Sequence, residues 1–83
     1  MAVSVVMPKF GQTMTEGTVV AWEKKPGDPV KKGEVLLRIE TDKSEMEVES
    51  DAAGTLLRID VQPGTVVPSG TVIAWIGEKG EKL

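Results

Sequence analysis

The chain contains an internal repeat, and this repeat limits the folds that it can adopt. Residues 16–43 align without a gap with residues 53–80, at a constant spacing of 37 residues. Turn and strand residues recur together, which predicts that the two halves are structural copies. Solenoid arrays need about three repeats to bury a continuous core, so two copies exclude such an array. The identical pairs are Gly17 and Gly54, Thr18 and Thr55, Pro26 and Pro63, Gly27 and Gly64, Val30 and Val67, Gly33 and Gly70, Val35 and Val72, and Ile39 and Ile76.

Each half reads as a strand, a Pro-Gly turn, a short bridging strand, a glycine turn and a second strand. In the first half these are residues 17–24, Pro26-Gly27, residues 28–30, Gly33 and residues 35–41. Val, Ile, Thr and Trp dominate the strands, and no window shows apolar residues at a spacing of about 3.6. The sequence therefore predicts no helix longer than one turn.

Two intertwined β-rich halves of equal length are expected to stack their sheets face to face. The chain has 83 residues, which is enough for one domain and too few for two. We therefore expect an all-β fold, a flattened barrel or sandwich of two small antiparallel sheets with an internal pseudo-two-fold axis (a barrel-sandwich hybrid). The domain is predicted to span residues 1–77, and the charged residues 78–83 are predicted to begin a flexible linker.

Composition narrows the possible functions. Cysteine and histidine are both absent, which removes disulfides, thiol nucleophiles, most zinc sites and the usual neutral-pH general base. A net charge of −3 and a pI near 4.9 argue against nucleic-acid binding. No apolar run approaches the roughly 20 residues of a membrane span, and the first residues do not read as a signal peptide. We expect a cytoplasmic (or mitochondrial matrix) module that is not itself an enzyme, with no catalytic residue and no metal.

The segment Glu40-Thr41-Asp42-Lys43-Ser44-Glu45 is the candidate functional site. Apolar residues alternate at 35, 37 and 39 before it and at 46 and 48 after it, so two strands meet in a tight turn at Asp42-Lys43. In the second half the position of Lys43 is taken by Gly80, in the tail. This asymmetry favours a special role for Lys43. A charged lysine in an exposed turn is also commonplace, and composition alone leaves both interpretations open.

Three stretches, MPKFGQTMTEGTVVAWEKKPGDPV, GEVLLRIETDKSEMEVES and GTLLRIDVQPGTVV, together resemble the lipoyl domains of 2-oxo acid dehydrogenase acyltransferase subunits. In that family a Glu-Thr-Asp-Lys turn carries the lipoylated lysine, after a Gly-Asp-x-Val element and before an acidic alternating strand and a Gly-x-Leu segment. All of these are present, and the resemblance extends from Val3 to Gly77. Ser44 stands where the family most often has alanine, which puts only the fine recognition in doubt.

The resemblance implies that lipoic acid forms an amide with Lys43, and that Asp42 and Ser44 present this lysine to a lipoylating enzyme. A thiamine-diphosphate-dependent 2-oxo acid decarboxylase would reductively acylate the lipoyl group. An acyltransferase core would then transfer the acyl group to coenzyme A, and a flavin dihydrolipoamide dehydrogenase would reoxidise the carrier. The chain would be a monomeric part of an acyltransferase subunit. Its first residues are closer to pyruvate and acetoin dehydrogenase domains than to the oxoglutarate type, which favours acetyl.

Residues 9–15 (KFGQTMT) resemble the family's exposed loop between the first two strands, which helps the decarboxylase to recognise its own domain. Phe10, Gln12 and Met14 in this loop, with Glu40 and Glu45 beside the turn, are the predicted partner-recognition residues. Phe10 could equally cap the core.

Two other functions compete with this one. A biotin carrier domain has a similar fold and also modifies a lysine at a hairpin tip, but it usually has methionine on both sides, where this chain has Asp42 and Ser44. The other alternative is an unmodified β-sandwich that binds a partner through a sheet edge or its acidic face.

Overall fold

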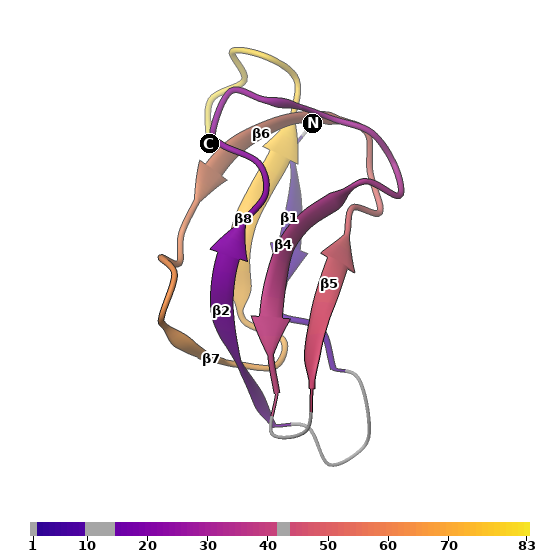
Figure 1. Ribbon diagram of the computed structural model, residues 1–83. Helices are drawn as coiled ribbons and strands as arrows, with labels where there is room; N and C mark the ends of the chain where they lie inside the picture. The colour runs from indigo at the N-terminus through magenta and orange to yellow at the C-terminus, as the bar shows by residue number, and fades with distance from the viewer. Residues whose placement is uncertain (1, 10–14, 42–43) are drawn as a thin grey trace.

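The computed structural model describes residues 2–9, 15–41 and 44–83. These residues form two four-stranded antiparallel sheets, with strand orders β1-β8-β6-β3 and β5-β4-β2-β7 (Figure 1). Within the described ranges there is no helix, so the predicted all-β class is confirmed. The strands are β1 (Val3–Val6), β2 (Glu16–Trp22), β3 (Pro29–Val30), β4 (Val35–Glu40), β5 (Glu45–Glu49), β6 (Gly54–Ile59), β7 (Val66–Pro68) and β8 (Val72–Gly77).

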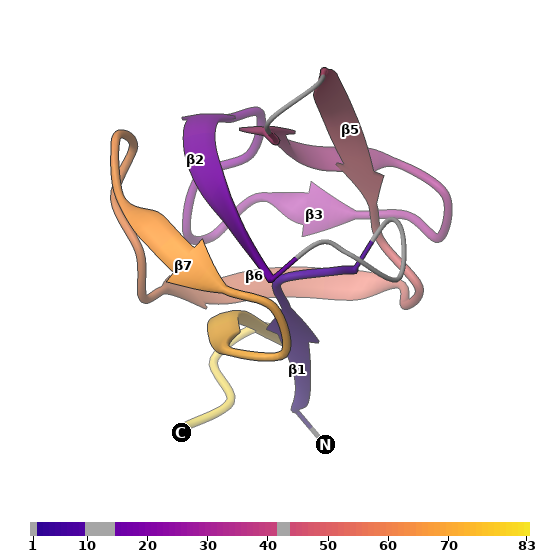
Figure 2. The ribbon, with the colours of Figure 1, turned by 90° about the horizontal axis from the view of Figure 1, so that it is seen from below.

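The sequence repeat is also a repeat of strand pairing. Gly17 of β2 pairs with Val67 of β7, and at a spacing of 37 residues Gly54 of β6 pairs with Val30 of β3. The short strand of each half therefore lies beside the long strand of the other half (Figure 2). The predicted intertwining of two equivalent halves is confirmed.

The core lies between the two sheets and takes apolar side chains from both halves. Leu36, Leu37 and Ile39 of β4 are completely buried, as are Leu56 of β6 and Ile73 of β8. The strict alternation that we expected along β4 is wrong at one point, because Leu36 is buried as well as Leu37. The pairing of β4 with β5 shifts register between Val35 and Leu37, and this bulge turns two consecutive side chains inward.

The molecule is elongated, with principal extents of 37 × 21 × 20 Å. Both termini lie at one end, whereas the end of β4, the start of β5 and the start of β2 lie at the opposite end (Figure 1). After β8 the chain turns, because Glu81 N donates to Glu78 O (2.9 Å) and Glu78 N donates to Glu81 Oε1 (3.0 Å). No part of the described chain forms a helix with the length and apolar character needed to cross a membrane.

Candidate functional site

The β4–β5 hairpin supports the candidate site. Its strands pair as far as Glu40 opposite Glu45. Beyond this pair, Thr41 N donates to Ser44 O (2.8 Å), Thr41 Oγ1 donates to the same oxygen (3.1 Å), and Ser44 N donates to Thr41 Oγ1 (3.4 Å). The hairpin is thus held closed up to the two residues that join Thr41 to Ser44. These are Asp42 and Lys43, which lie outside the described residues.

The outer side of β5 is acidic, as the alternating sequence predicts. Glu45, Glu47 and Glu49 are exposed, whereas Met46 packs against the core and Val48 is part of it. Glu40 and Ser44 are also exposed. Anything attached at this end of the hairpin would therefore have carboxylates as neighbours.

Arg38 of β4 moderates the negative charge beside the hairpin end. Its Nη1 lies 3.2 Å from Glu45 Oε1, and its Nε lies 3.5 Å from Glu23 Oε2. The three side chains are between 43% and 45% exposed, and ion pairs of this kind contribute less than about 1 kcal/mol. Arg38 orients Glu45 more than it stabilises the fold. Arg38 was not among the predicted site residues, although a position two residues before Glu40 lies on the same face of the strand.

The symmetry of the two halves includes the residues from which the chain leaves for β2 and for β6, which are Met7 and Ser50. Met7 N donates to Thr71 O and Gly70 N donates to Met7 O, both at 2.8 Å. Ser50 makes the corresponding pair of bonds with the residues 37 positions before Thr71 and Gly70. Ser50 N donates to Glu34 O, and Gly33 N donates to Ser50 O, both at 2.8 Å. Met7 and Ser50 are therefore structural counterparts, and both are buried.

From these counterparts onward the two halves differ in length. Gly17 follows Met7 by ten residues, whereas Gly54 follows Ser50 by four. The first half thus has six more residues in this connection, which includes the predicted loop 9–15. The strand β2 that follows starts at the same end of the molecule as the end of β4 and the start of β5 (Figure 1). The longer connection and the strand that follows β4 are thus two features in which the first half differs from the second.

The predicted site residues divide into two groups. Ser44, Glu40 and Glu45 lie together at the closed end of the hairpin. The others lie outside the described residues; they are Phe10, Gln12, Met14, Asp42 and Lys43.

Comparison with known proteins places this geometry in context. A family model described as "Biotin-requiring enzyme" matches residues 3–76. The chain is 51% identical over 83 residues to the dihydrolipoyllysine-residue acetyltransferase component of the acetoin cleaving system of Bacillus subtilis (strain 168), covering 100% of this chain and 21% of that protein. It is 45% identical over 84 residues to the corresponding component of the pyruvate dehydrogenase complex of Rickettsia bellii (strain RML369-C), covering 100% and 20%. The chain thus spans about a fifth of the length of these relatives.

The fold also matches a solved structure. The solution structure of the lipoyl domain of the 2-oxoglutarate dehydrogenase complex from Azotobacter vinelandii aligns with a TM-score of 0.75 and 38% identity, covering 94% of this chain and 99% of that one. The succinyltransferase component of the 2-oxoglutarate dehydrogenase complex of the same organism is 41% identical over 80 residues, covering 96% of this chain and 20% of that protein. The likeness therefore extends to relatives named for two different acyl groups.

Proposed function

Because the chain belongs to the biotin/lipoyl family, we propose that it is a swinging-arm carrier in which Lys43 bears lipoic acid through an amide bond. One observation carries this proposal. The hairpin is held closed at Thr41 and Ser44, and the only residues between them are Asp42 and Lys43. A lysine in that interval is bounded by a rigid support, and a modifying enzyme can recognise it by its position.

The residues around this interval fit an arm that projects away from the domain. Glu40, Ser44 and Glu45 are exposed. The described residues among positions 40–45 do not line the three cavities whose walls include Val5, Gly54 and Trp22, respectively. A group attached between Thr41 and Ser44 would be flanked by these exposed side chains, where other active sites could reach it.

When attached, the lipoyl group supplies a disulfide that accepts an acyl group together with two electrons, chemistry for which this chain has no cysteine. The chain itself supplies the attachment and its support. Amide formation at the Lys43 nitrogen removes an ammonium charge from the turn. The Thr41–Ser44 bonds hold the two strand ends together while the arm moves.

The position of the termini suits a tethered carrier. Both lie at the end of the molecule opposite the end of β4 and the start of β5 (Figure 1). In a longer acyltransferase subunit, linkers at the termini would leave the turn free to enter partner active sites. Tethering then raises the effective concentration of the arm at each site in turn. The proposed partners are a lipoylating enzyme, a thiamine-diphosphate-dependent decarboxylase, an acyltransferase core and a flavin dihydrolipoamide dehydrogenase.

Lipoate is favoured over biotin by the residues beside Lys43. Asp42 and Ser44 stand where biotin carriers usually have methionine. The relatives compared above are named for dihydrolipoyllysine, which gives independent support.

We further propose that the acyl group is acetyl, since the 51% and 45% identical relatives are acetyltransferase components. The test is to offer the lipoylated domain to purified pyruvate-decarboxylating, acetoin-cleaving and 2-oxoglutarate-decarboxylating enzymes and to follow reductive acylation by mass. Acetylation by the first two should be the faster reaction, and Lys43→Gln should accept nothing. Preference for the 2-oxoglutarate enzyme would contradict the acetyl assignment and leave the carrier role intact.

A further inference from the structure

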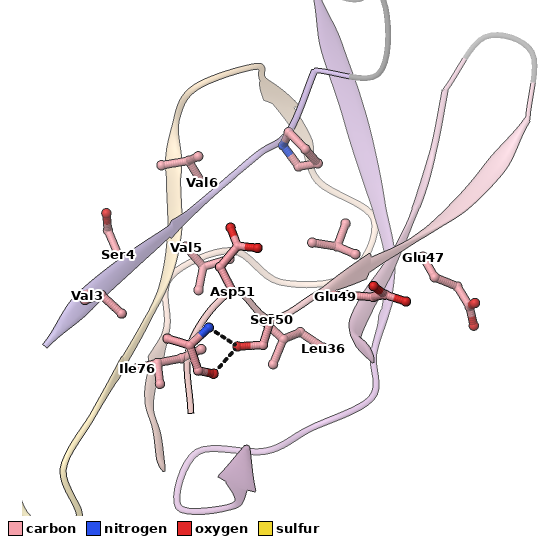
Figure 3. A pocket seen from close by; sticks show the side chains of 13 residues that line it. Val3, Ser4, Val5, Val6, Leu36, Glu47, Glu49, Ser50, Asp51 and Ile76 are labelled. Atoms are coloured by element: carbon pink, nitrogen blue, oxygen red, sulfur yellow. Dashed lines mark hydrogen bonds between the residues drawn. The ribbon is translucent and has the colours of Figure 1, made fainter. Parts of the chain in front are cut away.

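A groove separate from the hairpin end runs between the edge strands β1 and β5 (Figure 3). It has a volume of about 370 Å³ and takes none of its lining residues from positions 40–45. Leu36 and Ile76, which are 0% and 2% exposed, lie at its floor together with Val5. The sandwich is therefore open along this side, where a ligand could contact the edge of the apolar core.

One wall of the groove is the edge strand β1, which pairs only with β8 among the described strands. An unprotected edge leaves backbone N–H and C=O groups available to another chain, and proteins usually block it with charge, proline or short length. β1 contains neither a charged residue nor a proline, since its sequence is Val-Ser-Val-Val. Its side chains Val3 and Val6 are 46% and 42% exposed. The edge strands β3 and β7 are two and three residues long and contain proline.

The other wall is negatively charged. The charged residues that line the groove are Glu47, Glu49 and Asp51, with no Lys or Arg among them. Within the described part of the chain, none of the three forms an ion pair. Figure 3 shows the three carboxylates spread along this side of the groove, with Glu47 pointing away from it. A groove with an apolar floor and an acidic rim matches a ligand that is both aliphatic and basic.

We propose that the β1–β5 groove binds an extended peptide segment of a partner protein in which aliphatic residues alternate with Lys or Arg. The peptide backbone adds to the free edge of β1. Its aliphatic side chains cover Val3 and Val5, which lie on one face of β1 (Figure 3), and its basic side chains meet Glu49 and Asp51. A second copy of this chain would bring two acidic rims together, so charge favours a basic partner. The site does not depend on Lys43 or on its modification.

The experiment uses the unmodified 83-residue chain, labelled with ¹⁵N, and three acetylated and amidated probe peptides. In each probe peptide lysine alternates with one aliphatic residue, which is valine in the first, leucine in the second and isoleucine in the third. Each probe has a matched control peptide with glutamate in place of lysine. We expect the lysine peptides to shift the amide signals of residues 3–6 and 47–52, with little effect from the glutamate peptides. Absence of binding by all three lysine peptides would overturn the proposal. Equal binding of the glutamate peptides, or shifts confined to residues 40–45, would do the same.

Matched variants separate the groove from general electrostatic attraction. Glu49→Gln with Asp51→Asn should weaken binding about fivefold, the loss of two rim charges. Glu16→Gln with Glu23→Gln removes the same charge from the first residue of β2 and from the residue just after its end. Because β4 separates β2 from β5, affinity should stay within about 1.5-fold. Val3→Thr should weaken binding about threefold, because it replaces apolar contact by a hydroxyl. Equal losses in the two charge pairs would contradict the groove, and so would concentration-dependent shifts of β1 without peptide, which would indicate self-association.

Discussion

Leu36 of β4 and Ile73 of β8 are equivalent residues of the two halves. Each is the additional residue of a β-bulge. Both are completely buried. Leu36 lies where β4 shifts register against β5, and Ile73 lies where β8 shifts register against β1. A bulge bends its strand and increases the local twist. The same device, used twice, curves both sheets around one core.

This relationship predicts that Leu36→Ala and Ile73→Ala destabilise the domain by similar amounts, each by about 2 to 5 kcal/mol. Each change leaves a cavity where the two sheets meet, in a domain with little core to spare. Urea unfolding measures the loss of free energy. Val66→Ala is the control, because Val66 is 54% exposed and its replacement should cost less than about 0.5 kcal/mol. A large loss at one bulge with almost none at the other would contradict their equivalence.

Thr41→Val tests whether the closed hairpin matters for modification. Valine keeps the branched shape of threonine but removes the hydroxyl that donates to Ser44 O and accepts from Ser44 N. We expect the rate of lipoylation to fall severalfold, while the free energy of unfolding changes by no more than about 1 kcal/mol. The measurement is the rate of lipoyl incorporation by mass, with denaturant unfolding alongside.

Ser44→Ala is the matched control for this prediction. Ser44 contributes only backbone atoms to the Thr41 bonds, so its side chain should be dispensable and the rate should stay near that of the unchanged domain. An equal fall in the two variants would show that the enzyme reads side chains at the turn rather than its closure.

Acid stability should depend on Glu34. The Lys24 ammonium, 2.8 Å away, and then the Lys31 N–H, at 3.0 Å, hold the pKa of this carboxyl below its ordinary value of 4.5. Since the folded-state pKa is lowered, the stabilisation is present above the unfolded value and is lost as pH falls through the folded value. Unfolding of Glu34→Gln should therefore depend less on pH below 4.5 than unfolding of the unchanged domain.

An NMR titration of the Glu34 side chain checks the cause. In Lys24→Met the Glu34 midpoint should rise towards 4.5, because the largest lowering contribution is removed. A midpoint at or above 4.5 in the unchanged domain would contradict the assigned ion pair.

The repeat made most of the fold predictable from the sequence. Glycine and proline at matching positions marked the turns, and alternating apolar residues such as Met46 and Val48 marked the buried face of β5. The bulges were not predicted, because alternation assumes an unbroken ladder. Consecutive apolar residues at Leu36-Leu37 and again at Ile73-Ala74 were the available signal.

The candidate site was predictable in part. The pairing of Glu40 with Glu45 and the closed end at Ser44 follow from a two-residue turn. The ion pairs of Arg38 depend on which strands are neighbours, since Glu23 lies beyond the end of β2 and Glu45 begins β5. The groove between β1 and β5 depends in the same way on how the two sheets stack, which no local pattern reports.

The most direct test is an intact mass with peptide mapping, after separate incubation with a lipoylating enzyme plus lipoate and a biotinylating enzyme plus biotin. We predict one lipoyl increment, mapped to Lys43, and none in Lys43→Gln. That variant should unfold within about 0.5 kcal/mol of the unchanged domain, because the bonds that close the hairpin belong to Thr41 and Ser44. A biotin increment, or no modification at all, would contradict the lipoyl carrier assignment.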